Sequence, residues 1–251
     1  MQTGPVLAAL ALTLALAFTP AVTPPPPGGD VDYQLGGAVT PTRGVDVVVR
    51  DRTARPAAGR YNVCYVNAFQ TQPDAAPFWR RHWSLVLKRG GRPVADEAWG
   101  EWLLDIRTSP KRAALARIVG PWIDGCARSG YDAVELDNLD SWSRSSGLVT
   151  RAQAKAFART LVRRAHLRGL AVGQKNWSEL DGTTLGFDFA VAEECGRYDE
   201  CGDYVALYGR RVLVIEYRRA DFRRACARWG PRLGIVLRDR ALSPHGVRAW
   251  C

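Results

Sequence analysis

Eight short runs of apolar and β-branched residues recur along the chain, and they constrain its fold more than any other feature of the sequence. Such runs with helical stretches between them are typical of parallel strands joined by crossover helices. The runs are Val31–Leu35, Val45–Arg50, Tyr61–Asn67, Tyr131–Asp137, Leu170–Lys175, Phe187–Glu193, Arg211–Tyr217 and Leu233–Arg238. Eight strands that alternate with helices predict an α/β fold, a single-domain (β/α)8 or TIM barrel.

Three helices are predicted between these runs. In Thr150–Arg168, apolar residues recur at spacings of three and four and stop at Gly169, the pattern of an amphipathic helix that ends at a glycine. Lys111–Cys126 and Ala220–Trp229 are the other two. A doubly wound open sheet is the alternative, but the first strand lacks the glycine-rich phosphate loop that such folds carry.

Residues 1–28 are predicted to lie outside the barrel domain, which then spans residues 29–251. Val6–Val22 is apolar and uncharged and is followed by a proline-rich stretch, the pattern of a secretory signal peptide with its leader. An uncleaved membrane anchor is the alternative, but the run is shorter than the ~20 residues that a membrane-spanning helix needs. We expect a secreted, extracellular protein with no stable membrane insertion after processing.

The six cysteines agree with export, because an even set of cysteines is typical of proteins from oxidising compartments. Cys195 and Cys201 flank a segment of five residues, and we expect them to form a disulfide. The pairing of the other four stays open. A metal site is disfavoured because the chain has no CxxC motif and its three histidines lie at no ligand-like spacing. No metal and no cofactor are expected.

Acidic residues gather at the carboxyl end of the fourth predicted strand. Active sites of these barrels form at this end of the strands. Side chains alternate along a strand, so Glu135 and Asp137 share one face, and Asn138 and Asp140 follow directly. Capping of the next turn would explain the Asp-Asn pair but not Glu135 within the strand. We interpret this cluster as part of a functional site.

The next three strands end in the same kind of polar cluster, which combines hydrogen-bonding groups with aromatic rings. Its members are Lys175, Asn176 and Trp177, then Glu193 and Glu194, then Glu216 and Tyr217. Such a lining suits a sugar. Two carboxylates across one cleft cleave glycosidic bonds, one as general acid and the other as nucleophile or base. Asp137 and Glu193 are the predicted catalytic pair, and their division of roles stays open.

Several segments together resemble glycoside hydrolase family 114, the endo-α-1,4-polygalactosaminidases. They are Asp132–Asp140, Lys175-Asn176 with Glu179-Leu180, Phe187–Cys195, Asp32–Gln34, Trp99 with Trp102–Asp105, and Ile215–Tyr217. The resemblance implies a (β/α)8 barrel, a secreted or surface location, and hydrolysis of α-1,4-linked galactosamine polymers with Asp137 and Glu193 as catalytic candidates. Leu136 and Ala192 depart from the usual family pattern, which leaves the glycan less certain than the reaction.

The predicted substrate-binding residues are polar or aromatic and lie at or near strand ends. They are Asp32, Tyr33, Tyr65, Asn67, Trp99, Glu135, Asn138, Asp140, Lys175, Asn176, Glu194, Glu216 and Tyr217, with Trp177 as a further ring. Aromatic faces pack on sugar rings, although core packing is an equal alternative for any single one of them. Trp122 and Trp229 lie on predicted helices and are assigned to packing.

The formal net charge of +10 raises the possibility of a nucleic-acid partner. Arginine pairs such as Arg163-Arg164 and Arg223-Arg224 lie in or beside predicted helices, outside the barrel, and no nucleic-acid-binding motif accompanies them. Because the acids instead gather at strand ends, we expect an acidic mouth on a basic body, a polysaccharide partner with amino sugars, no nucleic acid, and a monomer. A non-catalytic carbohydrate-binding barrel, a hydrolase of another glycan and a metal-dependent deacetylase are the alternatives.

Overall fold

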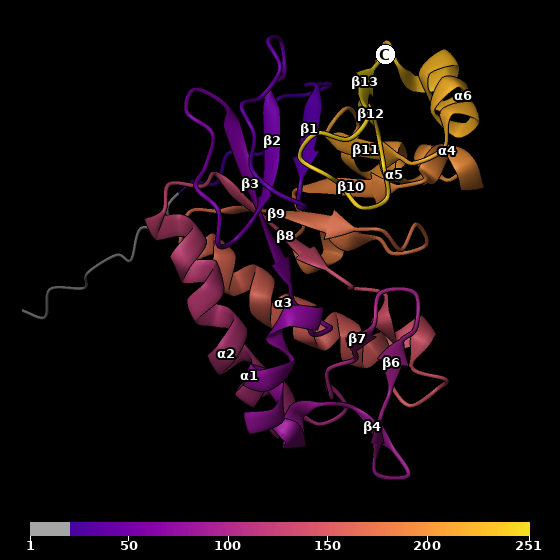
Figure 1. Ribbon diagram of the computed structural model, residues 1–251. Coiled ribbons are helices and arrows are strands. Elements are labelled where there is room, and N and C mark those ends of the chain that lie inside the picture. Colours follow the sequence, from indigo (N-terminus) through magenta and orange to yellow (C-terminus); the bar gives the residue numbers. More distant parts are fainter. Residues whose placement is uncertain (1–20) are drawn as a thin grey trace, which may run out of the picture.

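All eight predicted strands form one sheet in the computed structural model, which describes residues 21–251 (Figure 1). They are β1 (Val31–Gln34), β2 (Val47–Asp51), β3 (Tyr61–Asn67), β8 (Ala133–Asp137), β9 (Ala171–Lys175), β10 (Phe189–Glu193), β11 (Val212–Glu216) and β12 (Gly234–Arg238). Neighbours in this order pair in parallel. The sheet curves into a nearly closed barrel, and the predicted fold class is confirmed.

A ninth strand lies where the barrel would close. β13 (Arg248–Trp250) pairs antiparallel with β12. Its side chains reach across to β1: Trp250 Nε1 donates to the backbone oxygen of Val31 at 2.8 Å, and Arg248 Nε donates to the Asp32 carboxylate at 3.1 Å. Side chains rather than a ladder of backbone hydrogen bonds therefore join the two ends of the sheet.

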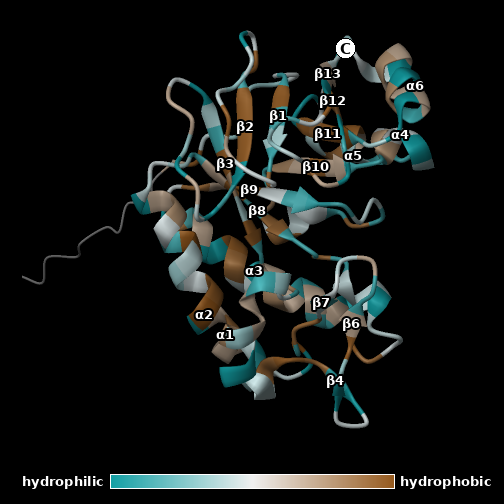
Figure 2. Cartoon of the chain, viewed as in Figure 1, coloured by the Kyte–Doolittle hydropathy of each residue, from teal (hydrophilic) through white to brown (hydrophobic). Residues whose placement is uncertain are grey.

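The barrel has an apolar interior and a second apolar layer under its helices. Inward-facing residues alternate along the strands and fill the interior, among them Val31, Val63 and Phe189. A Cβ at Gly173 would lie 2.7 Å from the Phe189 ring, so glycine there leaves room for that ring. Most of strand β2 is strongly hydrophobic, whereas the hairpin at β4 is largely hydrophilic (Figure 2).

The three predicted helices are confirmed as α2 (Ser109–Arg128), α3 (Arg151–His166) and α6 (Arg219–Trp229). Thr150 and Gln153 form a capping box at the start of α3. Shorter helices are α1 (Ala76–Arg81), α4 (Cys195–Tyr198) and α5 (Cys201–Tyr208). Helices do not follow every strand of residues 21–251, since loops join β1 to β2 and β2 to β3, and only a short 3-10 helix, η4 (Gly182–Leu185), lies between β9 and β10.

The connection from β3 to α2 carries small elements that the apolar pattern does not predict. Besides α1 they are the 3-10 helices η1 (Pro73–Ala75) and η2 (Trp83–Leu85), and two antiparallel hairpins. The first hairpin pairs β4 (Lys88–Arg89) with β5 (Arg92–Pro93), and the second pairs β6 (Ala95–Asp96) with β7 (Glu101–Trp102). A further 3-10 helix, η3 (Ser141–Arg144), follows β8. The β6–β7 hairpin supplies part of the site described below.

Residues 21–28, which the sequence assigns to the leader, contact the barrel. Tyr61 donates its hydroxyl to the backbone oxygen of Thr23 at 2.6 Å, and the Gly28 amide donates to the backbone oxygen of Arg210 at 2.8 Å. Most of the predicted signal segment lies at residues 1–20, outside the described residues. No helix in the described part of the chain is long and apolar enough to cross a membrane.

Three disulfides join all six cysteines. The predicted Cys195–Cys201 bridge is present, and the others are Cys64–Cys126 and Cys226–Cys251. Cys226–Cys251 ties the end of the chain to α6, while Cys64–Cys126 ties β3 to the end of α2. Disulfides persist in oxidising compartments, so this set fits an oxidising environment.

We expect the Cys64→Ala/Cys126→Ala variant to lose more stability than Cys195→Ala/Cys201→Ala. The first bridge spans 62 residues of sequence and the second only 6, and the entropy of closing the longer loop makes the difference about 2 kcal/mol. All four cysteines are buried, so replacing either pair with alanine leaves a similar cavity, and the two variants can be compared directly. Urea unfolding monitored by fluorescence measures both. Equal losses would contradict this ranking.

Candidate active site

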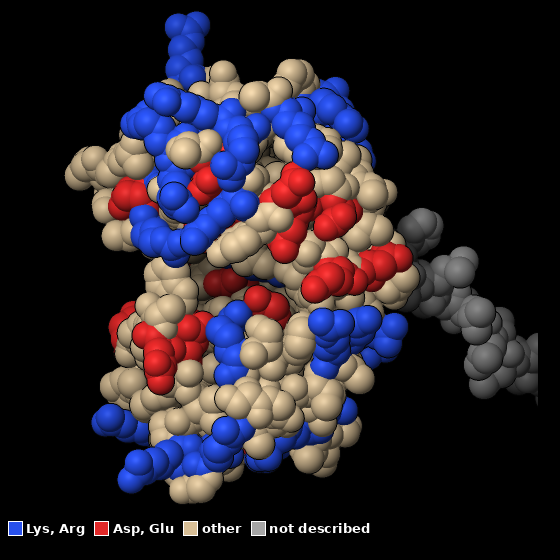
Figure 3. All heavy atoms as spheres, turned by 90° about the vertical axis from the view of Figure 1, so that its right-hand side faces the viewer, with Lys and Arg blue, Asp and Glu red and all other residues tan. Residues whose placement is uncertain are grey.

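The carboxyl ends of the strands surround a hollow lined with acidic residues. β9 and β10 point toward the right-hand side of Figure 1, and Figure 3 views the molecule from that side. Acidic side chains gather around the hollow, while Lys and Arg lie mainly above and below it. The hollow holds a pocket of about 300 Å³, which we call the catalytic pocket. Of the predicted site residues, ten line it: Tyr33, Tyr65, Trp99, Asp137, Asn138, Asp140, Lys175, Asn176, Glu193 and Tyr217.

Three neighbouring strands deliver the central side chains. Asp137, Lys175 and Glu193 are the last residues of β8, β9 and β10. Each is followed by a residue in the left-handed region, with φ of 61° at Asn138, 50° at Asn176 and 58° at Glu194. This conformation is costly for residues other than glycine and clusters at functional sites. The chain therefore turns away from the barrel directly after each of the three side chains.

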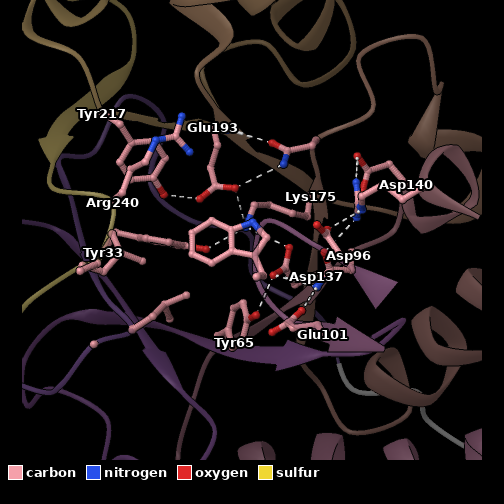
Figure 4. Close-up of a pocket in the computed structure, with 18 residues that line it drawn as sticks. Tyr33, Tyr65, Asp96, Glu101, Asp137, Asp140, Lys175, Glu193, Tyr217 and Arg240 are labelled. Atoms are coloured by element: carbon pink, nitrogen blue, oxygen red, sulfur yellow. Dashed lines mark hydrogen bonds and ion pairs between the residues drawn. The ribbon is translucent and has the colours of Figure 1, made fainter. Parts of the chain in front are cut away.

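Lys175 is the centre of the cluster (Figure 4). Its Nζ lies 2.7 Å from Glu135 Oε1, 3.1 Å from Asp137 Oδ1 and 3.3 Å from Glu193 Oε2. Burial disfavours the ammonium, but the surrounding carboxylates outweigh burial and raise the pKa of Lys175 well above its ordinary value. One permanent cation therefore holds three carboxylates together.

Asp137 is held in its ionised form. Burial works against ionisation, but the Lys175 ammonium and a hydrogen bond from Tyr65 outweigh it, and the pKa of Asp137 is lowered. Tyr65 donates its hydroxyl to Asp137 Oδ2 at 2.7 Å. One oxygen thus faces the ammonium and the other accepts from the tyrosine. Asp137 is a fixed carboxylate at the wall of the catalytic pocket.

Glu193 is the more accessible carboxylate, with 24% of its side chain exposed against 16% for Asp137. Tyr217 donates its hydroxyl to Glu193 Oε1, and Asn176 Nδ2 donates to Oε2 at 3.4 Å. Burial, together with the charge of Glu193, raises the pKa of Tyr217 well above its ordinary value, so the tyrosine keeps its proton and stays a donor. These contacts orient a partly exposed carboxyl group at the wall of the catalytic pocket.

The facing oxygens of Asp137 and Glu193 lie close together. Both contact the same Lys175 nitrogen, at 3.1 and 3.3 Å. The sum of these two distances is the largest separation that the two oxygens can have. Carboxyl groups lie roughly 5–5.5 Å apart in retaining glycosidases and roughly 6.5–9.5 Å apart in inverting ones, which need room for a water molecule.

Five of the predicted substrate-binding residues do not line the catalytic pocket. Glu135 lies beneath it, where it accepts from Tyr33 and Lys175, and Asn67 lies behind Glu101, to which it donates. The other three are Asp32, which accepts from Arg248, Glu194, which pairs with Arg240, and Glu216, which accepts from the Gly196 amide. Asp32 and Glu216 each sit one position from an inward-facing tyrosine, so alternation turns them away from the pocket.

Sequence reasoning missed four charged residues of the pocket: Asp96, Glu101, Arg144 and Arg240. Asp96 and Glu101 come from the β6–β7 hairpin, and Arg144 pairs with Asp96 at 2.8 Å. Arg240 follows β12 and stacks on Tyr217 with 5.2 Å to the ring centre. Acidic residues on both sides of Trp99, together with Gly100, which suits a turn, could have indicated this hairpin in the sequence. Within residues 21–251, no group of three or more His, Cys, Asp or Glu side chains is arranged to hold a metal ion.

We expect thermal stability to fall as pH rises from about 4.5 to 7. Burial raises the pKa of Glu101, Glu135 and Glu216 from 4.5 to about 7. Between these values the folded protein binds protons that the unfolded chain does not, so the stabilisation is full below pH 4.5 and is lost through pH 7. Hydrogen bonds from Arg164 lower the pKa of Asp124 to about 2, so its stabilisation is lost only as pH falls below 3.8.

Tm should therefore be highest between about pH 4 and 5 and lower by roughly 5–10 °C at pH 8. Calorimetry over this range measures it, with Glu216→Gln as the comparison, because that variant keeps the shape of the side chain and loses one titrating group. A Tm that is flat from pH 5 to 8, or a Glu216→Gln curve as steep as the wild type, would contradict the assignment.

The sequence profile of glycoside-hydrolase family GH114 matches residues 12–251. Ega3 from Aspergillus fumigatus, in complex with galactosamine, matches with a TM-score of 0.73 at 22% identity, covering 95% of this chain and 99% of that one. The glycoside hydrolase domain of PelA from Pseudomonas aeruginosa matches with a TM-score of 0.60 at 18% identity, covering 87% and 97%. No curated protein matches the sequence of this chain. The structural matches establish a shared fold.

Proposed function

The chain belongs to glycoside hydrolase family GH114 and is a glycoside hydrolase, and from that premise we propose that it cleaves α-1,4 bonds within galactosamine-containing polysaccharides. The observation that carries the proposal is the pair of carboxylates, Asp137 and Glu193, bridged by Lys175 at the mouth of the barrel. Two carboxylates at this spacing are the machinery of glycosidic bond cleavage.

Asp137 is the nucleophile in this proposal and Glu193 the general acid and base. Asp137 suits attack because its pKa is lowered by Lys175 and Tyr65. Its oxygen attacks the anomeric carbon while Glu193 gives a proton to the departing glycosidic oxygen, which leaves a glycosyl ester on Asp137. Glu193 then takes a proton from water, the water oxygen attacks the anomeric carbon, and the ester bond breaks. Net retention of configuration follows from two successive inversions.

The charge of the catalytic pocket supports an amino sugar as the substrate. Five carboxylates line it against three cations, and each cation is already paired with a carboxylate. A protonated amine is favoured in such surroundings, whereas an acidic sugar is not. The galactosamine complex of Ega3 concerns a protein of the same fold. We propose that the residues lining the catalytic pocket bind this substrate.

We further propose that the protein is secreted, acts outside the cell and works as a monomer. The three disulfides support an oxidising location. The removal of a leader before residue 29, and a single barrel domain over residues 29–251, are part of the same proposal. Mass spectrometry of the exported protein gives its first residue and its oligomeric state.

The experiment that tests the proposed function is a product analysis on a panel of glycans. The panel holds α-1,4-galactosamine polymer, its N-acetylated form, chitosan and a neutral α-glucan. We expect internal cleavage of the galactosamine polymer to a ladder of oligosaccharides. Cleavage of another glycan alone would refute the substrate and leave the reaction type in place.

A further inference from the structure

A second cavity adjoins the catalytic pocket at Glu193. It has a volume of about 480 Å³, within the size range of small-molecule sites, and we call it the side cavity. Glu193, Asn176 and Tyr217 line both spaces, whereas Asp137 lines the catalytic pocket but not the side cavity. Residues that line only the side cavity include Trp177, Glu179, Glu194, Tyr198, Glu200 and Tyr204. The proposed acid therefore stands at the junction and the proposed nucleophile on one side of it.

Two loops form one part of the wall of the side cavity. One follows β9 and carries Glu179. The other is the loop that the Cys195–Cys201 disulfide closes, and it carries Tyr198 and Glu200. Glu216, buried behind this loop, accepts from the Gly196 amide at 2.7 Å and so fixes the loop from inside. A covalent bridge and a buried hydrogen bond thus hold this wall in place.

The side cavity has carboxylates that no protein cation neutralises. Glu194 is paired with Arg197 and Arg240, at 2.8 and 2.9 Å. Glu179 and Glu200, by contrast, form no ion pair with any of residues 21–251. Burial, with the negative charge of Glu179 added to it, raises the pKa of Glu200. A cation in the cavity would relieve this repulsion.

Two exposed aromatic rings border the same space. Trp99 is 52% exposed and Tyr198 is 57% exposed, and both line the side cavity. Trp99 comes from the turn of the β6–β7 hairpin and Tyr198 from α4. Large rings left open to water at one cavity offer flat apolar faces to a ligand. A ligand with both an apolar face and a positive charge fits this lining.

We propose that the side cavity binds the sugar on the leaving-group side of the cleaved bond, and that Glu179 and Glu200 select there a sugar with a free ammonium over an N-acetylated one. The leaving-group side follows from the position of Glu193, because a general acid must reach the departing oxygen while the nucleophile contacts the sugar on the other side. This inference rests on the proposed function and adds to it the site that distinguishes a free amine from an N-acetylated one.

The test compares the Glu179→Gln/Glu200→Gln variant with the wild type on α-1,4-galactosamine oligosaccharides. We expect its KM to rise about 5–10-fold with kcat within about 2-fold, and the difference to shrink at high salt. On N-acetylated oligosaccharides the two proteins should have equal KM values. Asp203→Asn is the matched control, since Asp203 lies on α5 close to Glu200 but does not line the cavity; its KM should stay at the wild-type value.

Partially N-acetylated polymer gives a second readout that a structural role would not change. When the wild type cleaves this polymer, the fragment on the leaving-group side should carry galactosamine at its new non-reducing end. Fragments released by the double variant should carry either galactosamine or N-acetylgalactosamine there. Mass spectrometry of the fragments reads this directly. If the double variant matches Asp203→Asn in KM and in fragment ends, the inference fails and the proposed function stands. If the wild type cleaves no galactosamine polymer, the proposed function fails and the inference with it.

Discussion

Replacing Asp137 with asparagine is expected to lower kcat by roughly 10⁴–10⁶-fold, the range seen when a catalytic nucleophile is removed. An amide of the same size cannot attack the anomeric carbon, yet it still accepts the hydrogen bond from Tyr65. Tm should change by only a few degrees, because the shape of the side chain is kept. Steady-state rates on galactosamine oligosaccharides and a melting curve measure the two quantities.

The Glu193→Gln variant provides the comparison. As the proposed acid, Glu193 matters most when the departing oxygen needs a proton, so this variant should regain much of its first-step rate on a substrate with a nitrophenyl leaving group. Asp137→Asn should gain nothing from that substrate. A kcat of Asp137→Asn within about tenfold of the wild type, or rescue of both variants alike, would contradict the division of roles.

Replacing Lys175 with methionine is expected to destabilise the protein by about 3–5 kcal/mol, the cost of removing one partner from a buried ion pair. Glu135, Asp137 and Glu193 would then face one another without a cation. The pKa of Asp137 should rise, because the positive charge that lowers it is gone. The acid limb of the pH profile of kcat/KM should therefore move to higher pH.

Urea unfolding and the pH profile test the Lys175 variant together. Lys88→Met is the control, since Lys88 lies in the β4–β5 hairpin away from the catalytic pocket. It should leave both the unfolding curve and the acid limb close to the wild type. An acid limb that stays in place in Lys175→Met would show that Lys175 does not hold Asp137 ionised.

Strand positions could be predicted because the barrel interior imposes them. Runs such as Phe187–Glu193 are apolar on both faces, since one face fills the barrel and the other packs under helices. The same alternation places Asp137 and Glu193 at the top of the interior. Helix content was harder to predict, because β1 and β2 are followed by loops whose sequences carry no helical period.

The orientation of Asp32 and Glu216 could also have been derived from the sequence. Each precedes a tyrosine, Tyr33 or Tyr217, that lines the catalytic pocket. Neighbouring side chains on a strand point to opposite faces, so only one member of each pair can reach the pocket. The number of polar residues at a strand end predicts less well which side chains reach the pocket than the alternation of side chains along the strand does.

Asp96, Glu101 and Arg240 could not be placed by strand patterns. Asp96 and Glu101 lie in the β6–β7 hairpin, which is inserted between β3 and α2. Tertiary packing alone brings this hairpin to the catalytic pocket. Arg240 lies in the loop after β12, where its pairing with Glu194 joins residues 46 positions apart. Contacts over such separations follow from the closed barrel and not from local sequence.

The stereochemistry of hydrolysis tests the central claim most directly. Proton NMR of α-1,4-galactosamine oligosaccharides, recorded from the first minutes after the wild-type protein is added, reports the anomer that forms first. The close approach of Asp137 and Glu193 around Lys175 predicts new α reducing ends, with β ends appearing only by later mutarotation. New β ends at the start, or no cleavage of these oligosaccharides, would contradict the account.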